Sequence, residues 1–222
     1  GIRTSPRDKL IYLSQSKETL GLSFGFQRSM DHLGAVFGPL PAFYLLARSI
    51  NIRSIFFISA LPSLIVLILL FFIREKEGVQ EEKTGSKRIQ KGTILYMLSI
   101  FIFSLGNASD AFIVILLHSS GFSVVDIPLI WALFNATKSL FSTPFGWLSD
   151  RYGRKRIVVL GWLLYSAVYF LFPLYKGKKL LLLLLLYGIY YAMTEGVEKA
   201  LLGGMIDKKI GTMYGIFNFF IY

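Results

Sequence analysis

Charged side chains stand inside three of the long apolar segments of this 222-residue chain: Asp31, Lys138 and Glu195. If each segment is a helix, a rise of about 1.5 Å per residue places all three about 21–24 Å below the outer ends of their helices. Charges at such depth are costly in a bilayer, so they usually face a cavity or pair with one another. We therefore predict one buried cluster of two acids around one base, in which the surplus acid carries a proton.

A purely structural arrangement of the same residues fits the sequence too. Asp31 would then cap its helix near the cytoplasm, and Lys138 would pair with Glu195 only to stabilise the fold. Depth alone does not separate the two interpretations, because the rotation of each helix decides which side chains face each other.

Other polar residues inside the apolar segments are candidates for a substrate or proton pathway. Asn135 and Lys138 lie one turn apart on one helix face, and Tyr187, Tyr191 and Glu195 follow at four-residue steps. Packing is the competing explanation for the two tyrosines. Glu198 continues this stripe near the helix end, where we expect an interfacial salt bridge. The candidate pathway residues are Asp31, Asn107, Asp110, Asn135, Lys138, Tyr187, Tyr191 and Glu195.

A compact motif joins two of the apolar segments: Gly146-Trp-Leu-Ser-Asp150-Arg151-Tyr-Gly153-Arg154-Lys155-Arg156. Gly146 permits close helix contact, and Gly153 permits a tight turn. An acid such as Asp150 is expected near a basic partner and near the positive end of a neighbouring helix.

Composition excludes several classes of protein. Apolar residues make up 54% of the chain and charged residues 17%, whereas soluble domains carry about 25% charged residues. The chain has no cysteine and two histidines, so we expect no disulfide, metal or other cofactor. The sequence shows no nucleotide-binding Gly-x-x-x-x-Gly-Lys-Ser/Thr loop and no residue pair typical of a membrane enzyme, which predicts that the protein is not an enzyme.

Six apolar runs are long enough to cross a bilayer as helices. Their period is not that of barrel strands, so the fold is predicted to be all-α and integral to the membrane. The runs cover residues 27–47, 54–73, 94–118, 124–148, 157–175 and 180–206, and a seventh begins near Thr212.

The net charge of +11 comes from basic residues that lie between the apolar runs, and this distribution does not indicate a surface that binds nucleic acid. Alternation of the runs places four basic segments on one side, and these hold seventeen of the twenty-four lysines and arginines. Such a bias marks the cytoplasmic side, so the linker 74–92 and the loop 149–156 are predicted to be cytoplasmic. The four segments are Arg3–Arg28, Arg74–Lys91, Arg151–Arg156 and Lys208–Lys209.

The chain also repeats itself at an offset of about 190 residues. Arg7-Asp8-Lys9-Leu10-Ile11 precedes Gly21-Leu-Ser-Phe-Gly25-Phe26, and Glu198-Lys199-Ala200-Leu201-Leu202 precedes Gly211-Thr-Met-Tyr-Gly215-Ile216. Both copies place a charged doublet about ten residues before a glycine-aromatic-glycine helix start. Two related halves of six helices are a recurrent plan among transporters.

The motif at Gly146–Arg156 closely resembles the signature loop of the major facilitator superfamily. The resemblance covers the whole chain and implies a bundle of two six-helix halves, here incomplete. Residues 1–73 would end the N-terminal half with helices five and six, and 74–92 would be the central linker. Residues 93–222 would be helices seven to ten and the start of eleven. The resemblance assigns gating to Gly146, Asp150, Arg151, Gly153, Arg154 and Lys155 and places Asp150 near Arg154 and near residues 21–25.

A second element resembles part of the family's antiporter signature: Gly34-Ala-Val-Phe-Gly38-Pro39. A packing face of small residues with a proline kink is an equal explanation for Gly34, Gly38 and Pro39. The resemblance implies a secondary transporter that moves a small solute by alternating access, with proton-coupled efflux as the favoured direction. We expect a monomer in the lipid bilayer of the inner cell membrane that binds no nucleic acid. A sensor or assembly factor that does not transport is the alternative on the same fold.

Overall fold

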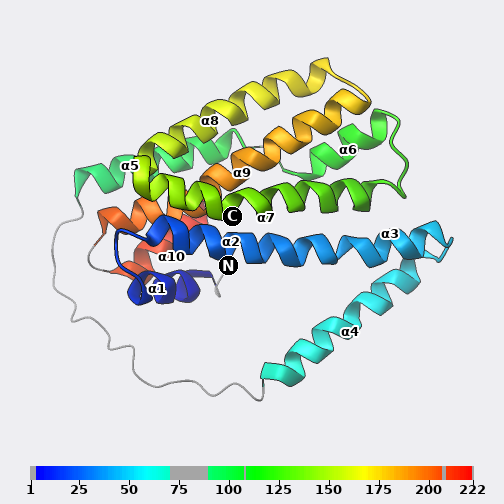
Figure 1. Cartoon of the computed structure of the whole chain (residues 1–222), viewed down its shortest axis with the longest axis horizontal. Helices are drawn as coiled ribbons and strands as arrows, with labels where there is room; N and C mark the ends of the chain where they lie inside the picture. Colours follow the sequence, from blue (N-terminus) through cyan, green and yellow to red (C-terminus); the bar gives the residue numbers. More distant parts are fainter. Residues whose placement is uncertain (1–3, 71–89, 108, 207–208, 222) are drawn as a thin grey trace.

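The computed structural model describes residues 4–70, 90–107, 109–206 and 209–221, and helices are the regular elements of these residues (Figure 1). This confirms the predicted all-α fold class. In chain order the helices are α1 (Thr4–Ser14), α2 (Leu20–Phe37), α3 (Pro39–Ala47), α4 (Ile52–Leu70), α5 (Lys91–Leu105), α6 (Ala111–Ser119), α7 (Ile127–Tyr152), α8 (Arg154–Leu171), the 3-10 turn η1 (Phe172–Leu174), α9 (Lys178–Met205) and α10 (Ile210–Ile221).

Two of the predicted spans are each divided into two helices. The run predicted at 27–47 is α2 followed by α3, and α2 already begins at Leu20. It breaks at Gly38 because Pro39 lacks a backbone N–H and its ring favours the first position of a new helix. The run predicted at 94–118 is α5 followed by α6, with the break at residues 106–110. Tyr165 donates a hydrogen bond of 2.9 Å to the carbonyl oxygen of Gly106. This bond satisfies one of the carbonyl groups that have no partner within the helix where α5 ends.

Length and apolar composition identify two described helical stretches that could cross a membrane, Arg154–Leu174 and Lys178–Met205. Shorter apolar helices cover Ile52–Leu61, Lys91–Leu105 and Ile210–Ile221. The outer surface is strongly apolar, with Phe57 80%, Phe170 74% and Phe219 82% exposed. An exposed surface of this kind needs a partner other than water.

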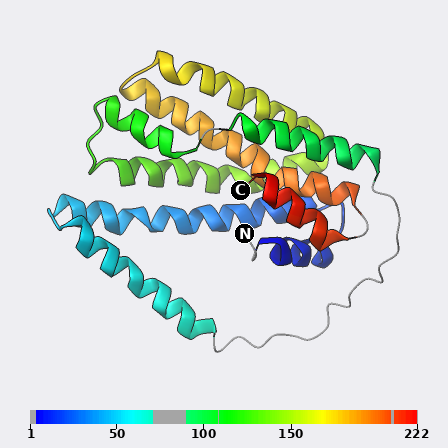
Figure 2. The ribbon, with the colours of Figure 1, turned by 180° about the vertical axis from the view of Figure 1, so that it is seen from behind.

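Loops gather at two opposite ends of the bundle. The start of α5, the junction of α7 with α8 and the C-terminal end of α9 lie at one end, at the left of Figure 1. The turns 48–51, 120–126 and 175–177 lie at the other end. α4 leads away from the bundle, as the view from behind in Figure 2 also shows. Of the predicted linker 74–92, residues 74–89 lie outside the described residues, and the last residues, from Lys91, already belong to α5.

α2, α7 and α9 cross closely because glycines face one another at their contacts. A Cβ added at Gly25 would lie 2.5 Å from the carbonyl oxygen of Ser142, and one added at Gly196 would lie 3.0 Å from the amide nitrogen of Gly25. A Cβ at Gly146 would collide with the backbone of Gly21. Ser29 and Ser139 reinforce the contact between α2 and α7, since the hydroxyl of each donates to the backbone carbonyl of the other.

The predicted packing role of Gly34 and Gly38 is not seen within the described ranges. A Cβ at Gly34 would meet nothing within 4 Å, and one at Gly38 would meet only the carbonyl oxygen of Gly34. Gly21, Gly25, Gly146 and Gly196 make the close contacts instead. Pro39 does mark the break between α2 and α3.

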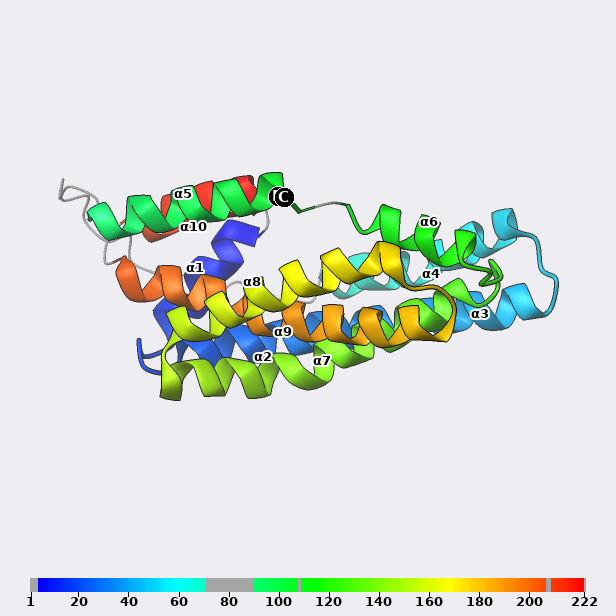
Figure 3. The same ribbon diagram turned by 90° about the horizontal axis from the view of Figure 1, so that it is seen from above.

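Figure 3 shows α5 and α6 on one side of the bundle and α7 on the opposite side, with α9 between them. Two buried apolar clusters lie along α9. One joins it to α2, α5 and α10 through Phe24, Ile100 and Tyr214. The other joins it to α6, α7 and α8 through Leu117, Phe134 and Tyr165. Polar residues of α9 lie between these clusters, and they line a cavity.

Candidate functional site

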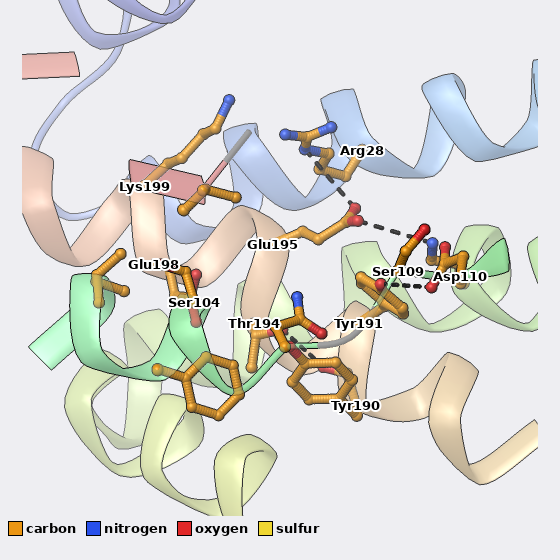
Figure 4. A pocket seen from close by; sticks show the side chains of 15 residues that line it. Arg28, Ser104, Ser109, Asp110, Tyr190, Tyr191, Thr194, Glu195, Glu198 and Lys199 are labelled. Atoms are coloured by element: carbon orange, nitrogen blue, oxygen red, sulfur yellow. Dashed lines mark hydrogen bonds and ion pairs between the residues drawn. The ribbon is translucent and has the colours of Figure 1, made fainter. Parts of the chain in front are cut away.

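A cavity of about 510 Å³ lies between α2, α5, α7 and α9 (Figure 4). This volume falls in the range of small-molecule sites in proteins. Charged and aromatic side chains line it, among them Arg28, Asp110, Lys138, Tyr191, Glu195 and Glu198.

Glu195 is the centre of a buried charge network, which we call the Glu195 network: Glu195, His32, Lys138 and Arg28. Its Oε2 lies 2.7 Å from Nε2 of His32 and 3.8 Å from Nε of Arg28. Its Oε1 lies 3.7 Å from Nζ of Lys138. The acid comes from α9, Lys138 from α7, and the other two bases from α2, so three helices meet at one carboxylate.

The structure therefore brings Lys138 and Glu195 together, as the sequence analysis predicts. The ammonium of Lys138 also lies 3.6 Å from the ring centre of Tyr191, a cation–π contact that favours the charged amine.

Asp31 does not join that pair directly, so the predicted three-residue cluster is wrong in its composition. Its Oδ2 lies 3.3 Å from Nη1 of Arg7 and 3.7 Å from Nη1 of Arg28, and Gln27 also donates to it. Its side chain is 40% exposed. Arg28 thus stands between the two acids, because Asp31 lies on the side of α2 that faces α1. In the Glu195 network the bases therefore outnumber the acids, and the surplus acid predicted for this cluster is not found.

Sequence reasoning missed Arg28, which it counted in a cytoplasmic basic segment. Arg28 is instead a buried residue in the middle of α2, 8% exposed. The signal that could have found it is the spacing of Arg28, Asp31 and His32, which places three ionisable groups on one or adjacent helix faces once α2 starts at Leu20.

Asp110, Tyr187 and Tyr191 form a second polar group at the break between α5 and α6. Both tyrosine hydroxyls donate to Oδ1 of Asp110, at 3.2 Å for Tyr187 and 3.1 Å for Tyr191. Asn107 lines the same cavity, and its Oδ1 is buried without a hydrogen-bond partner in the described part of the chain. Asn135 does not reach the cavity group. Its amide donates to the carbonyl oxygen of Trp131 within α7, at 2.9 Å.

Glu198 differs from its predicted role as an interfacial salt bridge. It is 7% exposed, and the indole Nε1 of Trp162 donates to its Oε1 at 2.8 Å. Its neighbour Lys199 is the residue in an ion pair, at 2.7 Å from Asp8 of α1.

Asp150 ties the signature loop to the start of α2. Its Oδ1 accepts from the backbone N–H of Gly21 at 2.9 Å, and its Oδ2 accepts from that of Leu22 at 2.8 Å. Arg154 Nε donates to the same carboxylate at 2.9 Å. A carboxylate at a helix N-terminus meets both free N–H groups and the positive end of the helix dipole. Both contacts are those predicted for Asp150.

The remaining basic residues of the loop point outward. Arg151 lies over the Trp147 ring, 5.6 Å from its centre, and Lys155 is exposed. Gly153 has φ of 104°, a conformation that glycine adopts without strain, and it turns the chain from α7 into α8. Among the described residues, the charged side chains of this loop that connect helices are Asp150 and Arg154; Arg154 also donates to the carbonyl oxygen of Ala200 on α9, at 3.3 Å.

Comparison with known proteins agrees with the signature loop. The model of the family described as Major Facilitator Superfamily matches residues 5–222. The chain belongs to the Major Facilitator Superfamily. The chain is also 36% identical, over 231 aligned residues, to the uncharacterised MFS-type transporter MJ1317 of Methanocaldococcus jannaschii. That alignment covers 98% of the chain and 58% of the relative, so the chain spans little more than half of that relative's length. No solved structure matches the chain.

Membership of the Major Facilitator Superfamily places the chain in a family of membrane transporters. It also accounts for the apolar outer surface, which suits contact with lipid. Among the residues described, no group of three histidine, aspartate or glutamate side chains is placed to hold a metal ion.

Proposed function

We propose that the complete protein is a secondary transporter that moves a small solute across the membrane by alternating access, coupled to protons. The observation that carries this proposal is the Glu195 network beside the cavity. Buried charges at membrane depth are expensive and mark substrate or proton pathways by default. Membership of a transporter family and the similarity to an MFS-type transporter support it.

Proton coupling is proposed from the contact between His32 and Glu195. Histidine is the side chain whose charge normally changes between pH 5 and 8. A proton gained at His32 strengthens its attraction to Glu195, and a proton gained at Glu195 releases His32, Arg28 and Lys138 together. Because these bases lie on α2 and α7, the protonation of one carboxylate changes the contacts of α9 with both helices. Efflux in exchange for protons is the direction we favour.

Alternating access also needs a contact that closes one side. We propose that Asp150 and Arg154 close the cytoplasmic side, because they join α7, α8, α2 and α9 at one end of the bundle. On this proposal the same end of the bundle, with the linker 74–92 and the loop 149–156, faces the cytoplasm. The protein then lies in the inner cell membrane.

The full-length protein in sealed vesicles tests the transport proposal. Vesicles are loaded with a small-molecule cell extract, a proton gradient is imposed, and the solutes released are identified by mass spectrometry. We expect at least one solute to leave faster than from protein-free vesicles, and faster with the gradient than without it. Glu195→Gln should remove the gradient dependence, whereas Asp126→Asn, an exposed acid outside the cavity, should leave it intact. Equal release from protein-containing and protein-free vesicles would favour a sensor that does not transport.

A further inference from the structure

The carboxylates in the cavity wall are not all matched by basic residues. The wall holds three acids, Asp110, Glu195 and Glu198, and three bases, Arg28, Lys138 and Lys199. Two of the bases, Arg28 and Lys138, contact the same acid, Glu195, and the third, Lys199, pairs with Asp8 outside the wall.

The acids of the wall without an ion-pair partner are Asp110 and Glu198. Neither has a basic group within 4 Å among the residues that the structure describes, while Arg28, Lys138 and Lys199 each have an acid within that distance. Asp110 is held by two neutral tyrosine hydroxyls and Glu198 by a neutral indole N–H. These donors fix the direction of each carboxylate but do not neutralise it. A buried or half-buried carboxylate without a counter-charge is costly, and a positively charged ligand would supply that counter-charge.

Aromatic rings supply the second half of such a site. Phe103, Tyr190 and Tyr191 line the cavity, and Figure 4 shows Tyr190 and Tyr191 beside it. The ring of Tyr191 already carries the Lys138 ammonium at 3.6 Å, which shows that this ring accepts a cation on its face. Phe103 stacks on Trp162 with centres 4.7 Å apart, and this Trp162 is the donor to Glu198.

We propose that this cavity binds an organic cation whose charge faces the carboxylates of Asp110 and Glu198. The inference rests on the proposed transport function and adds the class of its substrate. Tyr191, the partner of Asp110, lies seven residues before Glu198 on α9, which is about 10 Å along the helix axis. The two acids therefore offer successive positions for one cation along α9. Asn107, with its unpartnered Oδ1 in the same wall, accepts a hydrogen bond from an amine or hydroxyl of the ligand.

The conservative variants of the two acids make a direct test possible. Asp110→Asn keeps an oxygen for the two tyrosine hydroxyls, and Glu198→Gln keeps one for the Trp162 indole, while each removes one negative charge. Asp126→Asn removes a charge of the same kind outside the cavity and serves as the control. Each purified variant of the full-length protein is first checked for an unchanged unfolding temperature and elution volume.

The probe is benzyltrimethylammonium, which carries a permanent charge and an aromatic ring. Its uncharged carbon isostere neopentylbenzene and the anion phenylacetate are the comparison ligands, and binding is measured by saturation-transfer NMR with competition. We expect the cation to bind more tightly than either comparison ligand. Each cavity variant should weaken that binding about tenfold, the effect of losing one favourable charge contact, and Asp126→Asn should not. Asp110→Glu should restore part of the binding.

The result that would overturn the proposal is tighter binding of phenylacetate or neopentylbenzene, no binding of the cation, or cation binding that neither cavity variant weakens. The vesicle experiment tests the transport proposal separately. Release of an anionic or neutral solute would support the transport proposal and reject the proposal of a cationic substrate. Charge-dependent binding of the probe without transport of any solute would reject the transport proposal and support the cation site.

Discussion

The ammonium of Lys199 lies 2.7 Å from Oδ2 of Asp8, and the exposed fraction of the two side chains is 1% and 0%. Asn218 of α10 donates to the same oxygen at 3.0 Å. Asp8 and Lys199 come from different copies of the sequence repeat, each from the charged doublet that precedes an apolar run. This pair therefore joins the two repeats at one point, between α1 and α9.

Asp8→Asn should destabilise the protein, because it leaves the buried Lys199 without a counter-charge. The loss of one partner of a buried ion pair costs about 3–5 kcal/mol of unfolding free energy. The measurement is thermal unfolding of the full-length protein in detergent. The exchanged variant Asp8→Lys with Lys199→Asp should recover most of the loss. If Asp8→Asn alone unfolds at the temperature of the unsubstituted protein, the pair does not hold the two repeats together.

Asp150→Asn should lower transport without preventing membrane insertion. The amide keeps one acceptor for the N–H groups of Gly21 and Leu22 but loses the charge that binds Arg154 and the start of α2. Hydrogen bonds to charged groups contribute about 1.5–3 kcal/mol each, so the closed cytoplasmic state should become much less populated. Arg156→Gln, in the same loop and exposed, is the matched control. Normal transport by the Asp150 variant in the vesicle assay would reject the gating role.

Gly25→Ala should weaken the crossing of α2 with α7. The added methyl group would lie 2.5 Å from the carbonyl oxygen of Ser142, so the helices must separate, at a cost of about 1–3 kcal/mol. Gly92→Ala is the control, since a Cβ there meets nothing within 4 Å. Unfolding of the two variants in a common denaturant series measures the difference. Equal stability of both would mean that this close approach does not limit the packing.

The topology can be tested by labelling with a membrane-impermeant thiol reagent, because the chain has no cysteine of its own. A cysteine at Ser86 should react only after the membrane is opened, whereas one at Lys178 should react in intact cells. The reason is the bias of lysine and arginine toward the cytoplasmic side. Labelling of the Ser86→Cys protein from outside intact cells would reverse the orientation.

Much of the candidate site could be predicted from residue types and helical spacing. The sequence analysis placed Tyr187, Tyr191 and Glu195 on one face of α9 and paired Glu195 with Lys138, and the structure shows both. It failed at Asp31 and Glu198, because the partners of a charged group depend on how neighbouring helices rotate and cross. Asp31 turned toward Arg7 of α1, and Glu198 toward Trp162 of α8.

The sequence by itself determined the helical character, the family and a few of the helix ends. These follow from local properties: apolar runs of bilayer length, a proline after Gly38, a turn glycine at position 153, and a motif whose residues are close in the chain. Only the tertiary structure decided that α2 begins early enough to bury Arg28, that the run 94–118 breaks beside Asp110, and that Asp8 meets Lys199. Those relationships depend on side chains from segments that are distant in the sequence. The free-energy cost of burying a charge depends on which partners the folded structure places beside it.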